Sequence, residues 1–243
     1  MAEPTPAGAR LIQDGPLPGA VNMARDEALL ETRRVPTLRF YRWDRPTLSL
    51  GYFQPADDLP LEAVRARGGA VVRRSTGGKA ILHEHELTYS LCAPEAGALA
   101  GGPAAAMTAV HEALAAELER QAEATVTLRR EAAMRSDIGG SAWCFEDSSP
   151  LDLALDGRKL LGSAARRRDG WILFHGSLVL TVPAETPDVA ALGREPDETA
   201  LARVLGAALG LDFAAGAWDP AELERAEAIA AAKFGTEAFT LRR

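Results

Sequence analysis

The sequence predicts an α+β domain built on a mixed, mostly antiparallel sheet that is flanked by helices. Alanine-rich segments whose apolar residues recur at three-to-four spacing indicate helices. Short apolar runs separated by aspartate–glycine pairs indicate strands that are joined by hairpins. Strands in neighbouring hairpins, flanked along the chain by helices, are typical of a sheet with helices packed on it.

Four segments have the pattern of helices. In the second of them Met107, Val110 and Leu114 lie on one apolar face. The last is preceded by Asp219 and Pro220, an N-cap followed by a proline at the first helical position. The predicted helices are residues 21–33, 104–120, 197–209 and 221–233.

Strand-like runs fill most of the chain between the first helix and residue 182. Asp156-Gly157 and Asp169-Gly170 are strong signals for two-residue hairpin turns. Residues 93–103, rich in alanine and glycine, are expected to form a surface loop. The predicted strands are residues 37–41, 47–51, 71–72, 80–82, 87–92, 151–155, 158–164, 171–174 and 177–182.

Composition excludes several classes of protein. The 243 residues are 47% apolar and carry a formal net charge of −7, which is typical of a soluble globular chain and leaves no excess positive charge for nucleic-acid phosphates. The apolar runs are far shorter than the ~20 residues that a membrane helix needs. We therefore expect no nucleic-acid partner, no membrane partner and a cytoplasmic location. Residues 1–19 are expected to be an N-terminal extension and residues 20–243 a single domain.

Two cysteines, Cys92 and Cys144, are too few for a disulfide scaffold, and no CxxC motif is present. Cys144 and Phe145 precede the predicted strand that carries Lys159. An ammonium close to a thiol favours the thiolate, which is the nucleophilic form, but sequence alone does not establish that proximity. A lone cysteine also packs as a small apolar residue, which is what we expect of Cys92.

The segment RRSTGGKAILH, residues 73–83, is a candidate binding turn. Gly77 and Gly78 allow the backbone to approach a ligand closely, and Arg73, Arg74 and Lys79 add positive charge. A hairpin turn with solvated basic residues is the alternative. The segment is not a phosphate-binding P-loop, because Arg73 stands at the first glycine position and neither Ser nor Thr follows Lys79.

The run His83-Glu84-His85-Glu86 could place two histidines on one face of a strand. We do not expect a metal site, because no third ligand is nearby and Glu84 would lie on the opposite face. Packing, or a single histidine that contacts a ligand, is the favoured interpretation.

Small residues mark two predicted neighbouring strands. Gly162, Ser163 and Ala164 leave room for something narrow, such as an acyl chain, although a tightly packed sheet would have the same pattern. His175 and Gly176 repeat the theme on the next strand. Basic residues also cluster on this hairpin, as a solvated face or as a docking patch for an acidic protein; they are Arg158, Lys159, Arg166, Arg167 and Arg168.

Taken in order, these motifs resemble the lipoate–protein ligase and octanoyltransferase family, whose catalytic domain is related to biotin–protein ligase. The likeness spans roughly residues 20–240. It implies a class II synthetase-like, biotin/lipoate protein ligase-like catalytic domain. The motifs that carry it are NMARDEALL (22–30), TLSLGYFQ (47–54), RRSTGGKAILHEHELTYSL (73–91), GRKLLGSA (157–164), HGSLVL (175–180) and AKFGTEAF (232–239).

Two chemistries occur in that family, and this sequence resembles the ATP-independent one more. Ligases that form an acyl-adenylate typically have a third glycine where Lys79 stands, and an Asn-Asp pair where Leu151-Asp152 stands. Cysteine-dependent octanoyltransferases have a Cys-Phe pair before the lysine at about the separation of Cys144 and Lys159.

The resemblance therefore implies transfer of an octanoyl group from acyl carrier protein through a cysteine thioester to a lysine of a lipoyl-accepting protein. The acceptor would be a glycine-cleavage carrier protein or a dehydrogenase lipoyl domain, with no cofactor and no metal. An ATP-dependent lipoate or biotin ligase, a related amidotransferase and a catalytically silent binding protein are the alternatives. The expected catalytic residues are Cys144 and Lys159, and the expected substrate-binding residues are Arg74, Thr76, Gly77, Gly78, Lys79, His83, Gly162, Ser163, Ala164, His175 and Gly176.

Overall fold

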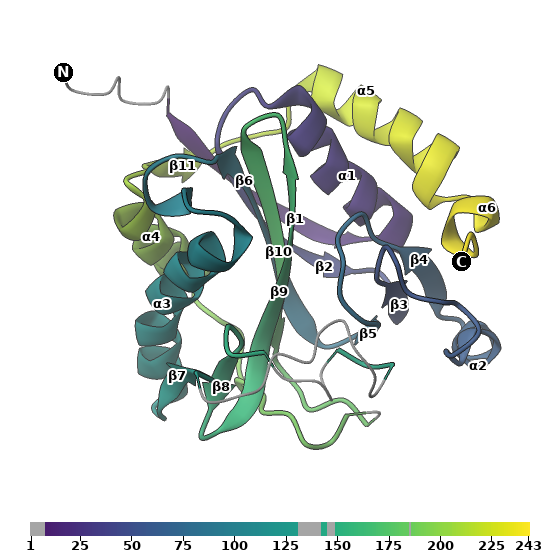
Figure 1. The fold of residues 1–243 in the computed structure, drawn as a ribbon, viewed down its shortest axis with the longest axis horizontal. Coiled ribbons are helices and arrows are strands. Elements are labelled where there is room, and N and C mark those ends of the chain that lie inside the picture. The colour runs from purple at the N-terminus through teal and green to yellow at the C-terminus, as the bar shows by residue number, and fades with distance from the viewer. Residues whose placement is uncertain (1–7, 131–141, 145–148, 185) are drawn as a thin grey trace.

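Two β-sheets organise the structure, a computed structural model that describes residues 8–130, 142–144, 149–184 and 186–243 (Figure 1). Within these residues the larger sheet has eight strands in the order β11-β1-β2-β6-β10-β9-β8-β7. The smaller sheet has the order β4-β3-β5. β1 pairs in parallel with β2 and β11, whereas β2, β6, β10, β9, β8 and β7 pair antiparallel. The prediction of a mixed, mostly antiparallel sheet flanked by helices is confirmed.

The strands of the larger sheet are β1 (Ala9–Leu17), β2 (Thr37–Trp43), β6 (Glu86–Pro94), β7 (Val126–Leu128), β8 (Leu153–Leu155), β9 (Arg158–Arg168), β10 (Trp171–Val179) and β11 (Phe213–Ala215). Those of the smaller sheet are β3 (Thr47–Leu50), β4 (Ala70–Arg73) and β5 (Ile81–His83). The helices are α1 (Gly19–Thr32), α2 (Leu61–Ala66), α3 (Pro103–Ala122), α4 (Glu198–Leu209), α5 (Pro220–Ile229) and α6 (Glu237–Thr240), with a 3-10 helix at Gly97–Leu99 and a π-helical turn at Ala230–Phe234.

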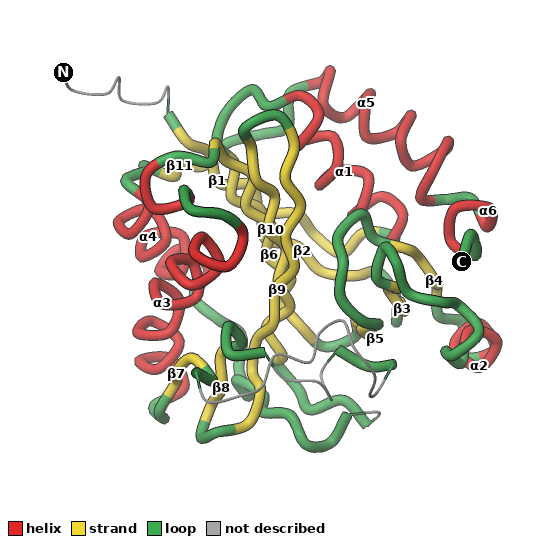
Figure 2. Tube along the Cα trace, viewed as in Figure 1, coloured by secondary structure: helices red, strands yellow, loops and turns green. Residues whose placement is uncertain are grey.

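Alternation along β2 shows how the large sheet is covered on both faces. Leu38 and Phe40 belong to the main core beneath α3 and α4, whereas Tyr41 and Trp43 pack with α1 and α5. Successive side chains of a strand point to opposite faces, so one strand supplies two cores. Figure 2 shows α3 and α4 together on one side of the sheet and α1 and α5 on the other.

Both predicted hairpin turns are present. Asp156 and Gly157 have φ of 48° and 80°, and Asp169 and Gly170 have φ of 49° and 76°. Positive φ at both turn residues matches the right-handed twist of the paired strands, and aspartate followed by glycine tolerates it best. The first turn joins β8 to β9 and thereby fixes where Lys159 enters the sheet.

The four predicted helices correspond to α1, α3, α4 and α5, the last continuing into the π-helical turn. The observed strands differ more from the predicted ones. Residues 37–41 and 47–51, expected on either side of one turn, lie in β2 and β3 of different sheets. Residues 171–174 and 177–182 belong to one strand, β10, which ends at Val179. The expected loop at 93–103 begins with the last two residues of β6 and contains the 3-10 helix.

The N-terminal region contributes to the sheet. Residues 9–17, expected to belong to an extension, form β1 between β2 and β11. Arg10 pairs with Thr37 of β2, and Ala9 pairs with Phe213 of β11.

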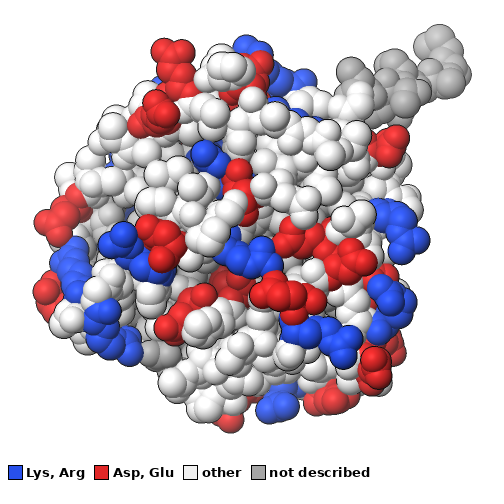
Figure 3. All heavy atoms as spheres, turned by 180° about the vertical axis from the view of Figure 1, so that it is seen from behind, with Lys and Arg blue, Asp and Glu red and all other residues white. Residues whose placement is uncertain are grey.

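Within the described residues, no helix combines the length and apolar character that crossing a membrane requires. On the face opposite that of Figure 1, acidic and basic side chains are interspersed (Figure 3).

Candidate active site

A mostly apolar cavity of about 190 Å³ opens where β3, β5, β9 and β10 meet the glycine turn. It brings together residues that are up to 154 positions apart, from Met23 to Ser177. The lining residues are Met23, Tyr41, Trp43, Ser49, Arg74, Gly78, Lys79, Ile81, His83, Thr88, Met107, Cys144, Ser149, Leu151, Asp152, Lys159, Gly162, Ser163, Ala164, His175, Gly176 and Ser177.

Cys144 and Lys159 are in contact at this cavity. Lys159 Nζ lies 3.8 Å from Cys144 Sγ and donates a 2.9 Å hydrogen bond to the Cys144 carbonyl oxygen. The same ammonium is 2.9 Å from Asp152 Oδ2 in an ion pair whose side chains are both buried. Burial alone would lower the pKa of Lys159, but Cys144 and Asp152 outweigh it and raise the pKa, so the ammonium persists at neutral pH.

Two local features place the Lys159 ammonium. The register between β8 and β9 shifts next to Lys159, which pairs with Ala154. A Cβ on Gly162 would stand 2.9 Å from Lys159 Cε and 3.3 Å from Asp152 Oδ1. Gly162 therefore leaves the space in which the lysine and aspartate meet.

Arg74 holds the glycine turn in shape. Its guanidinium donates to the carbonyl oxygens of Ser49, Gly77 and Lys79 and to Ser49 Oγ, over 2.6–3.2 Å. These bonds use all five of its N–H groups. Gly78 has φ of +87°, a conformation that other residues rarely adopt. Burial lowers the pKa of Arg74 to about 10, which leaves it charged at neutral pH.

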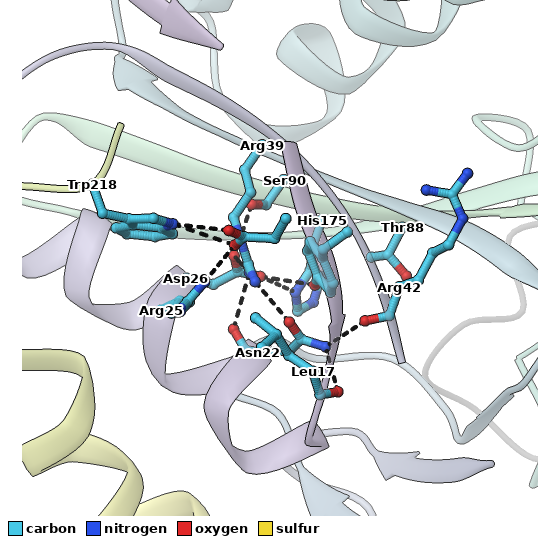
Figure 4. A network of polar contacts seen from close by, with 12 residues as sticks. Leu17, Asn22, Arg25, Asp26, Arg39, Arg42, Thr88, Ser90, His175 and Trp218 are labelled. Carbon is cyan, nitrogen blue, oxygen red and sulfur yellow. Dashed lines mark hydrogen bonds and ion pairs between the residues drawn. The ribbon is translucent and has the colours of Figure 1, made fainter. Parts of the chain in front are cut away.

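His175 belongs to a buried network around Asp26 of α1, drawn in Figure 4. Its Nδ1 is 3.6 Å from Asp26 Oδ2, and its Nε2 is hydrogen-bonded to Thr76 Oγ1. Asp26 also accepts hydrogen bonds from Arg39 and Ser90, at 2.9 and 2.7 Å. Burial lowers the pKa of His175, only partly offset by Asp26, so the imidazole is neutral at pH 7.

His83 lies between a carboxylate and a hydroxyl. Its Nδ1 is 2.6 Å from Glu86 Oε1 and its Nε2 is 2.7 Å from Ser49 Oγ. The ring of Trp43 stacks on it with centroids 4.0 Å apart and an angle of 12°. Ser49 and Glu86 are both buried. Together with His83 they form a continuous chain of hydrogen bonds, of which Ser49 and His83 line the cavity.

A third polar chain closes the wall near α3. Ser163 Oγ is 2.7 Å from Tyr89 Oη and 2.7 Å from His111 Nε2. A Cβ on Gly176 would lie 2.3 Å from Ser163 Oγ and 2.4 Å from the Tyr89 ring. Gly176 therefore makes room for this contact, which explains why small residues occur on both β9 and β10.

All but two of the residues expected at the site line the cavity. Thr76 lies behind His175, and the carbonyl of Gly77 accepts from Arg74. Phe145, the partner of Cys144 in the motif, lies outside the described residues.

Four polar partners of the site were not predicted: Asp26, Ser49, Glu86 and Asp152. Asp26 lies at three-to-four spacing from Met23, Leu29 and Leu30 in the first predicted helix, and Ser49, Glu86 and Asp152 each directly precede a leucine of an apolar run. An acidic or hydroxyl side chain in such a position is the signal that could have found them, because buried polar groups need partners.

Two interpretations of the sequence change in the structure. His83 and His85 do not share a strand face: β5 ends at His83, which is buried, whereas His85 is exposed in the following turn.

Among the described residues there is no group of three or more acidic, His or Cys side chains that could hold a metal ion.

The predicted basic cluster on the β9–β10 hairpin presents less free positive charge than the sequence indicates. Lys159 is buried in the cavity wall, and the three arginines at the end of β9 are each paired with a glutamate. The pairs are Arg166–Glu27, Arg167–Glu95 and Arg168–Glu31.

Comparison with known proteins defines the class. A family described as the lipoyl protein ligase A/B catalytic domain matches residues 18–197. The chain belongs to this family.

Its curated relatives include two octanoyltransferases LipM. The protein of Moorella thermoacetica is 42% identical over 202 residues, which are 81% of this chain and 73% of that protein. The protein of Symbiobacterium thermophilum is 35% identical, covering 96% of this chain and 98% of that protein.

Solved structures share the fold. A lipoate-protein ligase A bound with ATP superposes with a TM-score of 0.79 at 23% identity, covering 97% of this chain and 99% of that chain. A bi-partite lipoate protein ligase from Thermoplasma acidophilum gives 0.74 at 22% identity, with 96% of both chains covered. At these identities the likeness concerns the fold alone, and it confirms the expected biotin/lipoate protein ligase-like fold.

Proposed function

We propose that this chain takes an octanoyl group from acyl carrier protein onto Cys144 as a thioester and passes it to a lysine of a lipoyl-accepting protein. Octanoyltransferase activity follows from the curated relatives, which are 35% to 42% identical over most of the chain. The observation that carries the route is the 3.8 Å contact between Lys159 Nζ and Cys144 Sγ at a mostly apolar cavity.

In the first half-reaction the Cys144 thiolate attacks the carbonyl carbon of the carrier thioester. A new C–S bond forms, the C–S bond to the carrier breaks, and the carrier leaves as its thiolate, which takes a proton from water. Lys159 favours the thiolate because its ammonium stays charged beside the sulfur. Since one thioester replaces another, the acyl group remains activated and the transfer needs no ATP.

The acceptor is a lipoyl-accepting protein, either a glycine-cleavage carrier protein or a dehydrogenase lipoyl domain. Its lysine amine attacks the Cys144 thioester, an amide forms, and the Cys144 sulfur leaves with one proton of the amine as the thiol. The apolar lining around Met23, Met107 and Ile81 provides the surface on which the alkyl chain would be buried.

An ATP-dependent ligase is the second candidate, but the glycine turn disfavours it. All five N–H groups of Arg74 are bonded within the chain, so this guanidinium has none left for a phosphate. The octanoyltransferase relatives point the same way.

Incubation with octanoyl carrier protein in the absence of ATP, followed by intact-protein mass, tests the proposal. We expect the wild-type chain and Cys92→Ala to gain one octanoyl group, and Cys144→Ala to gain none. Cys92 is a suitable control because it is fully buried in the sheet and burial raises the pKa of its thiol. An adduct on Cys144→Ala, or a requirement for ATP, would reject the proposed route.

A further inference from the structure

The second half-reaction requires a base that the cysteine–lysine pair does not supply. The acceptor lysine is an ammonium at neutral pH, since an unperturbed lysine titrates near 10.4, and it must lose a proton before it can attack. Lys159 cannot take that proton, because it is already an ammonium in a buried ion pair with Asp152, whose Oδ2 lies 2.9 Å from its Nζ.

Three histidines at or next to the cavity are paired with a hydroxyl, and their surroundings differ. His111 bonds Ser163 and, at its other nitrogen, only the carbonyl of Leu151. His175 has a carboxylate behind it, but Asp26 is already paired with the guanidinium of Arg39 at 2.9 Å. The hydroxyl that bonds His175 belongs to Thr76, which does not line the cavity.

His83 is the one of the three that has both a cavity-lining hydroxyl and a carboxylate without another cation. Glu86 is bonded to His83, Thr88 and Ser177 within the described part of the chain, and neither of the last two carries a charge. A proton that arrives on His83 would therefore be stabilised by the charge of Glu86, 2.6 Å away.

The direction of the hydrogen bonds fits a proton acceptor. Ser49 Oγ accepts from Arg74 Nη1 at 3.2 Å, and we assign its own proton to the 2.7 Å bond with His83 Nε2, because the Glu86 carboxylate can only accept and therefore takes the ring proton on Nδ1. His83 Nδ1–H then donates to Glu86. In this tautomer His83 Nε2 carries no proton, and it can accept one through the Ser49 hydroxyl.

Backbone pairings connect Ser49 to Cys144 through Ala80 and Ile81. Ser49 pairs with Ile81 across β3 and β5, and Cys144 N donates to the carbonyl of the preceding Ala80 at 2.8 Å. Ser49, His83 and Cys144 all line the same cavity.

We propose that Ser49, His83 and Glu86 form a proton relay that deprotonates the acceptor lysine. This inference rests on the proposed function. One proton passes from the acceptor ammonium to Ser49 Oγ while the Ser49 proton moves to His83 Nε2. The amine attacks the thioester carbonyl, the C–N bond forms, and the C–S bond to Cys144 breaks. The second nitrogen proton goes to the departing sulfur, which leaves with the bonding electron pair.

The test separates the two half-reactions in Ser49→Ala and His83→Gln. We expect both variants to form the octanoyl–Cys144 adduct within about twofold of the wild-type rate. Transfer from the isolated adduct to a lipoyl domain should fall by about 10²-fold or more, the range of general-base catalysis. Glutamine can still bond Ser49 and Glu86, so His83→Gln leaves no buried group unpaired.

Hydroxylamine provides a readout that a merely structural role would not produce. This amine is largely unprotonated at neutral pH and needs no base, so it should cleave the adduct of both variants as fast as that of the wild type. Thr37→Val is the matched control. It removes a buried hydroxyl that accepts from Arg10 and donates to the carbonyl oxygen of Val35, away from the cavity lining, and should leave both half-reactions unchanged.

Transfer to the lipoyl domain at the wild-type rate in Ser49→Ala would overturn the relay, and so would an equal loss with lysine and with hydroxylamine. Failure of the wild-type chain to form any Cys144 adduct would instead reject the proposed function and the relay with it.

Discussion

At the scale of single residues, the missing side chain at position 162 decides where the Lys159 ammonium lies. In Gly162→Ala the new Cβ would be 2.9 Å from Lys159 Cε, so the end of the lysine side chain must leave its present position. We expect the transfer rate to fall by roughly tenfold to a hundredfold, since small misplacements of catalytic groups are this costly. Steady-state kinetics and thermal unfolding measure the two effects separately.

Gly15→Ala is the control for that substitution, because a Cβ at Gly15 has no atom within 4 Å. Wild-type transfer by a folded Gly162→Ala protein would show that the position of Lys159 does not limit the reaction.

Lys159 also provides a test of how the thiol is activated. Lys159→Met keeps an unbranched side chain in the buried site but removes the charge that lies 3.8 Å from Cys144 Sγ. The Asp152 carboxylate would then lose the cation that neutralises it and would oppose the thiolate. We expect alkylation of Cys144 by iodoacetamide at pH 7 to slow several-fold. Equal alkylation rates in both proteins would contradict activation by this lysine.

At the scale of elements, the β9–β10 hairpin appears from sequence as a basic patch, but its arginines are paired. Arg166, Arg167 and Arg168 each lie within 3.5 Å of a glutamate oxygen, and their side chains are 32% to 51% exposed. Exposed pairs of this kind contribute about 0–1 kcal/mol each. We therefore expect the triple substitution to glutamine to leave the KM for the acyl carrier protein within about twofold.

Salt dependence distinguishes the outcomes for the hairpin. Steering by net charge is screened over a Debye length of about 8 Å at physiological salt. A raised KM in the triple variant, together with a flatter dependence on salt, would show that the hairpin attracts the carrier in spite of its paired glutamates.

At the scale of the whole molecule, the Arg39–Asp26 pair ties α1 to the large sheet. Arg39 and Asp26 are both buried, and the network reaches β6 through Ser90 and β10 through His175 (Figure 4). Arg39→Met would leave a buried carboxylate without its cation. We expect this to lower the free energy of unfolding by about 3–5 kcal/mol, measured by urea denaturation.

Arg45→Met removes an exposed arginine paired with Asp44 and should cost less than about 1 kcal/mol. An equally small cost for Arg39→Met would show that the buried pair does not hold α1 in place.

Acid sensitivity follows from two buried carboxylates of the same region. Burial alone would raise the pKa of Asp26 and of Glu86, but His175 and Arg39 lower the first, and His83 with the hydroxyls of Ser177 and Thr88 lowers the second. A carboxylate with a lowered pKa stabilises the fold above its unfolded value, and this stabilisation is lost as the pH falls through the folded value.

The ordinary values are 3.8 and 4.5, so we expect these carboxylates to add a decline in the free energy of unfolding below about pH 4.5, after a first decline below about pH 6.5 from His175, whose folded pKa is lowered by burial. Urea midpoints measured from pH 7 to pH 3 check this. A smaller decline in Asp26→Asn would assign part of the effect to that carboxylate, and a midpoint that is constant down to pH 3 would contradict the prediction.

Local patterns by themselves determined the helices, the two hairpin turns and the family. Periodicity places α1, α3, α4 and α5, and the turns at Asp156-Gly157 and Asp169-Gly170 need only their own two residues. These features depend on neighbours within a few positions, which is the range over which propensity and turn geometry act. The motif order around Cys144 and Lys159 similarly indicated the octanoyltransferase class.

Contacts between distant segments were decided only by the tertiary structure. The assignment of β2 and β3 to different sheets, and the place of β1 between β2 and β11, depend on partners far along the chain. The neutralised arginines of β9 depend on glutamates of α1 and of the segment after β6. The tertiary structure also identified the partners of two site residues: Asp152 pairs with Lys159, and Ser49 and Glu86 bond the two nitrogens of His83. These side chains are buried, and a buried polar group must find its partner within the protein.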